Sequence, residues 1–358
     1  MPALTDFWQR YAPTNGGVAT LLKKNATRAP QIGMIDAVVG SENKGGFQQD
    51  FNALTGGAGD SKKKIAMFKY HTRGVDADTL DETDAELNYC NPARTNEFLQ
   101  TEQEVTRYVS RQFKIADNKV RNFDETARQH FEMELEMEAV KLVTDLNKRM
   151  IALYEAVRGN TSAGTTAALT AQAFSSGADY KANIAWQESI RREFRKIQSG
   201  GKLMMVGDGL AESYANVLGY GQVNDFGQRV DLQPFDNRFA FFGDATLDSV
   251  IDGTGTVTDN ALVWEPGAFQ MLHWYQNRGD FRTMRDDAIN DTIAINVNGT
   301  RHVFDVFIRY SDCQDSTAGM HVTLKKWFDV WNYPTDIFKG TDALNGVNFL
   351  ERWIATAA

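Results

Sequence analysis

The feature that most constrains the fold is a run of residues, 124 to 158, that contains neither glycine nor proline. Its segment FEMELEMEAVKL, residues 131 to 142, opens with eight positions of strict apolar and acidic alternation, which is the period of a half-buried strand. Glu, Met, Leu and Ala are nevertheless good helix formers and poor strand formers. A wider window decides the matter, because apolar residues recur in helical steps of four and three at Phe131, Leu135, Ala139, Leu142, Leu146, Met150, Leu153 and Val157.

Charge supports a helix over 124–158. Residues 124–140 hold six acids and one base, whereas residues 141–158 hold four bases and two acids, which matches the helix dipole at each end. At about 1.5 Å per residue such a helix is roughly 50 Å long. A second, weaker apolar stripe lies roughly 160–200° around the helix from the first. Its members are Met133, Met137, Val140, Ile151 and Tyr154. We therefore predict a long spine helix with other structure packed along both sides.

Composition excludes several classes of protein. The net charge of −9 argues against strong direct DNA binding, because phosphate binding needs clustered Lys and Arg. The two cysteines, Cys90 and Cys313, stand 223 positions apart, so neither a zinc site nor a disulfide framework is expected, and a reducing compartment fits. The first twenty residues do not resemble a signal peptide, and no run of eighteen apolar residues occurs. The sequence predicts neither ordinary secretion nor a membrane span.

The N-terminal third of the sequence contains too few regular apolar segments to form a core of its own. Residues 1–40 are interrupted by Pro and Gly yet are apolar, which indicates an extended arm that lies against its own body or against a neighbour. Residues 41–92 are rich in Gly, Lys and Asp, and two strand-like runs, 47–54 and 65–70, indicate a long hairpin. A two-stranded hairpin is marginal alone, so this loop should gain its order from a partner surface. The cluster at Lys62, Lys63 and Lys64 is read as a solvated loop tip.

The middle of the chain mixes helices and strands. Residues 102–115 fit either a helix or a strand. Residues 159–182 are small and polar and read as a flexible connection at a domain boundary. A second amphipathic helix is predicted at 182–198, a short strand at 202–206 and another helix at 210–218. This second region therefore reads as α/β.

The clearest short-range signal lies near the C-terminus. Residues 292–297 alternate apolar and polar side chains, Asn298-Gly299 supplies a type I′ turn, and residues 304–310 alternate in return. This pattern predicts an antiparallel hairpin. Residues 321–331 and 346–354 are predicted as further strands of the same sheet or an adjacent one.

The sequence contains no motif that is specific for a catalytic, cofactor-binding or metal-binding site. Gly207-x-Gly209 follows a predicted strand, but Glu212 stands where a dinucleotide site needs a third glycine, so a plain strand-to-helix turn is favoured. Five histidines lack metal-type spacing, and His302 and His321 are the one pair that could approach across strands. The full set is His71, His130, His273, His302 and His321. We assign no catalytic, cofactor-binding or metal-binding residue and expect no cofactor and no enzyme activity.

The order of these elements resembles a known family, the Hong Kong 97-like major capsid proteins of tailed bacteriophages. The resemblance lies in the arm, the Gly- and Lys-rich loop, the spine helix, the α/β region and the late antiparallel sheet, with an aromatic strand texture in FIRYSDCQDSTAGMHVTLKKWFDVW, residues 307–331. It implies an α+β fold with these parts: an N-terminal arm at 1–40, an extended loop at 41–92, a peripheral domain at 93–182 with the spine helix at 124–158, an axial domain at 183–290, and C-terminal strands at 291–358 that complete the sheets.

The same resemblance implies a function. Coat subunits of this family self-assemble into hexamers and pentamers of an icosahedral shell around double-stranded DNA, in the virion capsid, after assembly in the host cytoplasm. Implied partners are other copies of the chain, a scaffolding protein or domain, a portal and decoration proteins, with weak contact to DNA and none to a membrane. No Lys and Asn pair can be nominated for a covalent cross-link. The alternatives are an encapsulin-like compartment shell and a soluble nucleotide-dependent α/β enzyme, the latter resting on Gly207 and Gly209 alone.

Overall fold

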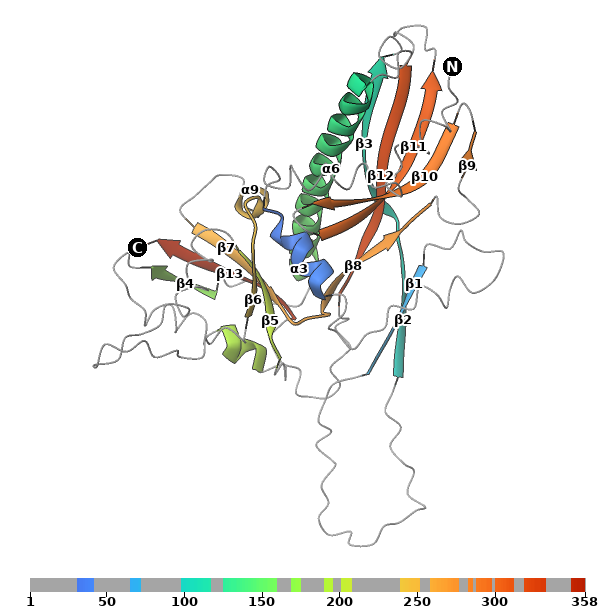
Figure 1. The fold of residues 1–358 in the computed structure, drawn as a ribbon. Coiled ribbons are helices and arrows are strands. Elements are labelled where there is room, and N and C mark those ends of the chain that lie inside the picture. The colour runs from blue at the N-terminus through green and yellow to red at the C-terminus, as the bar shows by residue number, and fades with distance from the viewer. Residues whose placement is uncertain are drawn as a thin grey trace, which may run out of the picture.

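The structure is a computed structural model that contains both helices and largely antiparallel sheets, so the α+β class is confirmed (Figure 1). It describes residues 31–41, 65–71, 98–116, 125–159, 169–174, 190–195, 201–207, 239–251, 258–276, 283–285, 288–297, 300–311, 319–332 and 349–357. In this part of the chain no helix is long and apolar enough to cross a membrane.

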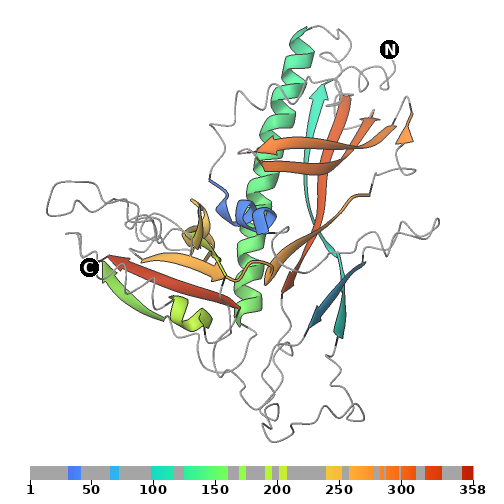
Figure 2. The same ribbon diagram turned by 60° about the horizontal axis from the view of Figure 1, so that its bottom comes forward.

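The predicted spine helix is confirmed as α6, Glu125–Gly159, a single helix of 35 residues. The first six members of its main apolar stripe, from Phe131 to Met150, are completely buried, and Leu153 and Val157 pack against the same core. Phe131 packs on Phe113 of the neighbouring sheet, with ring centroids 6.0 Å apart. In both ribbon views α6 runs along one face of a large sheet and ends at a second sheet (Figures 1 and 2).

The large sheet contains six strands in the order β3-β12-β11-β10-β9, and β8 pairs with the far end of β12. The predicted hairpin is confirmed, because β10 and β11 are antiparallel and Val297 pairs with Thr300. The ambiguous stretch 102–115 is strand, since most of it forms β3 beside β12. The strands are β3 (Arg107–Ala116), β8 (Phe269–Trp274), β9 (Thr283–Met284), β10 (Ala288–Val297), β11 (Thr300–Ser311) and β12 (Gly319–Asn332).

The small sheet contains five strands in the order β4-β13-β7-β5-β6. The predicted strand at 202–206 is present as β5, whereas the C-terminal strand begins four residues later than expected. One expectation is wrong: within 159–182, residues 169–174 form a strand parallel to β13 instead of a flexible connection. The strands are β4 (Leu169–Phe174), β5 (Leu203–Gly207), β6 (Phe239–Gly243), β7 (Thr258–Trp264) and β13 (Leu350–Ala357).

Each of the two sheets contains strands from more than one of the domains predicted from the sequence. β4 lies within the expected peripheral region 93–182 but joins the small sheet, while β8 and β9 lie within the expected axial region 183–290 but join the large sheet. Pairing between distant strands, which single-sequence patterns do not encode, decides this arrangement. Of the helix predicted at 182–198, residues 190–195 are described and helical, and its Ile190 and Phe194 are buried. The helix predicted at 210–218 lies outside the described residues.

A separate two-stranded ribbon lies apart from both sheets in the two views (Figures 1 and 2). It consists of β1, Ile65–His71, and β2, Phe98–Glu104, paired antiparallel from Ile65↔Glu104 to His71↔Phe98. The sequence expectation was wrong about the pairing, because the partner of the run at 65–70 is β2 and not residues 47–54, which lie outside the described residues. The ribbon therefore extends to Glu104, beyond the predicted limit at residue 92.

The end of the expected arm is helical. Residues 33–41 form α3, Gly33–Ser41, whose Met34, Ile35, Ala37 and Val38 are completely buried in the chain's own core. The sequence predicted an extended arm up to residue 40, and the structure corrects this limit to a point before Gln31. The reason is that the apolar residues of α3 pack on α6, β5 and β6. A short helix, α9 (Leu247–Ile251), packs beside α6 near the same place.

We predict that Gly33→Ala destabilises the fold. A Cβ at position 33 would lie 2.4 Å from the carbonyl oxygen of Gly243, so α3 would have to move away from β6. Overpacking of this kind costs about 1–3 kcal/mol. Chemical denaturation measures the loss, and Gly201→Ala is the matched control, because no atom lies within 4 Å of its added Cβ. Equal stability of the two variants would contradict the close packing of α3.

Candidate functional site

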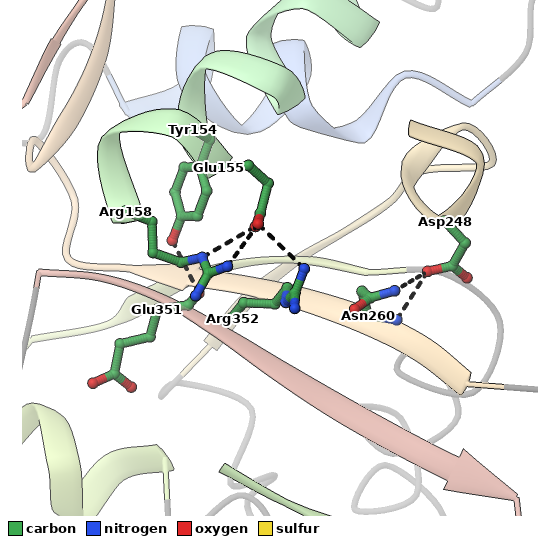
Figure 3. Close-up of polar contacts among 7 residues, drawn as sticks. All are labelled: Tyr154, Glu155, Arg158, Asp248, Asn260, Glu351 and Arg352. Carbon is green, nitrogen blue, oxygen red and sulfur yellow. Dashed lines mark hydrogen bonds and ion pairs between the residues drawn. The ribbon is translucent and has the colours of Figure 1, made fainter. Parts of the chain in front are cut away.

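The junction between α6 and the small sheet is built around Tyr154, which is completely buried one turn before the helix ends. Its ring packs against Trp264 and Phe269, with centroids 5.5 and 5.2 Å away. Its hydroxyl lies 3.0 Å from the carbonyl oxygen of Glu351 on β13 (Figure 3). It also lies 2.9 Å from the carbonyl oxygen of Val263 on β7, so it donates between two neighbouring strands. Burial, together with nearby Glu155 and Glu351, raises the pKa of Tyr154 well above its usual value, so the hydroxyl keeps its proton.

A carboxylate beside Tyr154 joins the helix to the last strand. Glu155 accepts hydrogen bonds from Arg158 one turn further on, at 2.7 Å from Nη2, and from Arg352 of β13 at 3.2 Å (Figure 3). All three side chains are largely shielded from solvent, so these charges are screened less than a surface pair. In the same view Asp248 of α9 accepts from the backbone and side-chain nitrogens of Asn260, which ties α9 to β7.

A second buried polar cluster holds the start of α3. Asp244, which is 1% exposed, accepts hydrogen bonds from Met34 N at 3.0 Å and from Asn147 Nδ2 at 2.7 Å. Its other oxygen accepts from the backbone N–H and the hydroxyl of Thr246, each at 2.8 Å. Asn147 of α6 in turn accepts from Ile35 N at 3.0 Å. The orphan N–H groups of the first turn of α3 are therefore capped by side chains distant in sequence.

Asp36 links α3 to the large sheet. Thr300, at the start of β11, donates to its carboxylate at 2.6 Å. Burial raises the pKa of Asp36, the bond from Thr300 opposes the rise, and the negative charge of Asp244 adds to it. One short helix thus contacts the long helix, the end of β6 and the large sheet through polar groups. The junction is the place where α3, α6, the small sheet and the start of β11 meet.

The residues singled out in the sequence do not converge there. Gly207 ends β5 opposite Gly243, while Gly209 and Glu212 lie outside the described residues. His302 pairs with Ile295 and His321 pairs with Arg309, so the two histidines do not meet across the strands. Among the described residues no group of three or more His, Cys, Asp and Glu could hold a metal ion. Cys90, Cys313 and Lys62 to Lys64 lie outside the described part of the chain.

Sequence reasoning missed the polar residues of the junction. Asn147 carried a usable signal, because a polar amide stands in α6 between the apolar Leu146 and Met150 and is completely buried. Buried polar groups require partners, so a contact with another element could have been expected at that position. Asp244 gave no comparable signal, since nothing in the surrounding sequence identifies an N-cap for a helix two hundred residues earlier.

His302 is a buried titratable group in the large sheet. It is 1% exposed, and its Nε2 has no hydrogen-bond partner in the structure. Burial and the positive charge of Lys326 lower the pKa of His302 to about 3, so the imidazole is neutral in the folded chain at pH 7.

The face of the large sheet opposite α6 carries aromatic rings and cations. Tyr108, which is 54% exposed, packs on Trp327 at 5.0 Å between centroids, and Trp327 meets Trp274 edge-on at 5.8 Å. Lys325 Nζ lies 4.1 Å above the Tyr108 ring and 3.8 Å above the Trp327 ring. These cross-strand contacts stabilise the region of the sheet where β12 pairs with both β3 and β8.

Comparison with known proteins gives matches among solved structures alone. No protein-family model matches the chain, and no curated protein is significantly similar to it. The chain is similar to the capsid of cyanophage Pam1, at 10% identity and a TM-score of 0.42, over 84% of this chain and 87% of that one. It is also similar to the capsid of cyanophage P-SCSP1u, at 10% identity and a TM-score of 0.39, over 82% and 84%.

A third match is a virus-like particle from Pyrococcus furiosus, at 7% identity and a TM-score of 0.36, over 90% of this chain and 97% of that one. These are the class of structure that the sequence resemblance predicted. Values this low carry no inference of their own, so the proposals below rest on the elements of this chain.

We predict that Tyr154→Phe destabilises the chain by about 1–2 kcal/mol, because the ring packing remains while two buried carbonyl groups lose a shared donor. Urea denaturation followed by tryptophan fluorescence measures the difference. The control is Tyr108→Phe, at a ring that is more than half exposed, for which a change within about 0.5 kcal/mol is expected. If Tyr154→Phe were as stable as the parent, the hydroxyl would not hold the junction together.

We predict that His302 makes the fold sensitive to acid. Because its folded pKa of about 3 lies below the ordinary histidine pKa of 6.5, its contribution is fully present above pH 6.5 and is lost as the pH falls toward 3. Between pH 7 and pH 5 this group alone should remove about 2 kcal/mol from the free energy of unfolding. His302→Gln and His302→Phe should each lose less stability over that interval than the parent does. An unchanged pH dependence in both variants would refute the prediction.

Proposed function

We propose that this chain is a major capsid protein of a tailed bacteriophage, with a Hong Kong 97-like fold, that assembles into hexamers and pentamers of an icosahedral shell enclosing double-stranded DNA. The observation that carries the proposal is α6. This one helix of 35 residues supports the large sheet along its first half and the small sheet at its end. The chain is thereby an extended plate of linked parts, which suits a subunit with many neighbours.

The ribbon β1–β2 also supports a shell subunit. Among the described strands these two pair with each other alone, and two-stranded ribbons are marginal in water without further packing. Residues 72–97, which join the two strands, add 26 residues of chain at its tip. A neighbouring copy that packs against the ribbon and this tip would supply the missing burial. Many such contacts, each weak, stabilise a closed assembly by their number.

We propose a structural and not a catalytic role for the junction. Two of its carboxylates serve as hydrogen-bond acceptors that join elements: the buried Asp244 caps α3, and the partly buried Glu155 ties α6 to β13. Its one buried phenol holds its proton and donates to two strands. Groups used in this way are fixed in position, which suits a subunit that must keep one shape through assembly.

The proposed setting follows from the shell function. The partners are further copies of the chain, a scaffolding protein or domain, a portal and decoration proteins, with assembly in the host cytoplasm and residence in the virion capsid. The net charge of −9 supports weak contact with packaged DNA, because like charges repel.

Electron microscopy of the purified and concentrated protein tests the proposal. We expect closed shells or rings of capsomers. A discrete monomer or dimer at every protein concentration and salt concentration would overturn it.

We predict that residues 72–97 are needed for assembly. Replacing them with Asn-Gly, a two-residue turn suited to a hairpin, joins His71 to Phe98 and keeps the ribbon. This variant should remain folded by circular dichroism but should sediment as a single subunit. Gly201→Ala, at an exposed position with free space around it, is the control and should assemble as the parent does. Normal shells from the shortened variant would show that the loop tip is not an intersubunit contact.

A further inference from the structure

The second apolar stripe of α6 is covered along only part of its length. Ile151 and Tyr154 are completely buried, whereas Met133 is 62% exposed and Met137 is 45% exposed. At about 100° per residue, positions 133, 137, 147 and 151 fall within roughly 80° of one another on the helix. The exposed methionines therefore continue the same face that is buried further along.

The element that begins to cover this face is α3. Its first turn sits on Asn147 through the bond from Ile35 N, and Gln31 just before it accepts a hydrogen bond from Ala245 N. Asn147 is ten residues from Met137 and fourteen from Met133, which is roughly 15 Å and 21 Å along the helix. The chain that leads into α3 therefore starts from this face of α6, roughly 15–21 Å along the helix from the uncovered methionines. Thirty residues could span up to about 100 Å, so residues 1–30 reach them easily.

Charge identifies these residues as a suitable occupant. Residues 131–140 of α6 carry four Glu and no Lys or Arg. Glu132, Glu136 and Glu138 are buried and have other partners, among them Lys141 for Glu138, so the partly exposed Glu134 is the acid that remains accessible beside the methionines. Residues 1–30 carry four basic residues and one acid, Asp6. Within VATLLKKNATR, residues 18–28, the apolar pair Leu21 and Leu22 directly precedes Lys23 and Lys24. A second copy of the α6 stripe is a poorer occupant, because it would bring the like charges of two Glu134 side chains together.

We propose that residues 1–30 dock along the exposed Met133 and Met137 stripe of the same chain, continuing the cover that α3 begins. The leucine pair packs on the two flexible methionine side chains, and the lysines lie beside the partly exposed Glu134. The segment would then complete the burial of α6 on its second side. This inference does not depend on the proposed shell function, because it concerns contacts within one chain.

Photo-cross-linking tests the proposal. A benzophenone amino acid is introduced at position 133 or 137, and at Arg149 as a control, since Arg149 is exposed on the opposite side of α6. Chains carrying light and heavy nitrogen isotopes are mixed before illumination, and the cross-linked peptides are identified by mass spectrometry. We expect positions 133 and 137 to cross-link to residues 1–30 with matching isotopes, and position 149 not to do so.

A charge variant and a truncation sharpen the test. Lys23→Glu with Lys24→Glu should lower the yield of the cross-link several-fold, whereas Lys202→Glu, at an exposed position elsewhere, should not. Removal of residues 2–29 should make peroxide oxidise Met133 and Met137 several-fold faster while the buried Met150 stays protected. Cross-links between light and heavy chains, cross-links to other segments, or none at all would overturn the proposal, as would unchanged oxidation in the truncated chain.

Discussion

The structure depends on covering a helix that is apolar on two sides. α6 is about 52 Å long at 1.5 Å per residue, far longer than one sheet of a small domain can cover. The large sheet takes the first part of its main stripe, and the small sheet and α3 take the end of its second stripe. This division produces a chain of linked parts in place of one round core. It also explains why strands from distant segments had to be brought to both sheets.

Polar groups then fix how the parts meet. Asp244 and Asn147 are buried, and such groups are tolerated inside a protein when their hydrogen bonds are made. Here they cap the first turn of α3, while Tyr154 bridges β7 and β13 and Asp36 reaches Thr300. Apolar packing alone would permit several docking positions for a nine-residue helix. The requirement to satisfy these buried polar groups selects one of them, and it makes the junction stiff.

The proposed function draws on the contrast between this stiff junction and the parts that lie away from it. A shell subunit needs a body that keeps its shape and appendages that can pack on neighbours. The junction provides the first, and the ribbon β1–β2 with its tip provides the second. The stretch of α6 that carries the exposed methionines belongs to neither group. In our proposal it is covered by the basic N-terminal segment of the same chain, which has the charge and the length to reach it.

The local sequence was sufficient to predict the elements that form from patterns within a single segment. The lack of Gly and Pro over 124–158 and its apolar period predicted α6 to within a residue at each end, and Asn298-Gly299 between alternating strands predicted the β10–β11 hairpin. Tertiary structure decided the rest. The pairing of β1 with β2, the strand at 169–174 and the docking of α3 on Asp244 were not predicted, because each depends on groups far away in the sequence. A short segment carries too little burial to specify its own state, so its partners choose between helix, strand and loop, and those partners are defined only once the chain has folded.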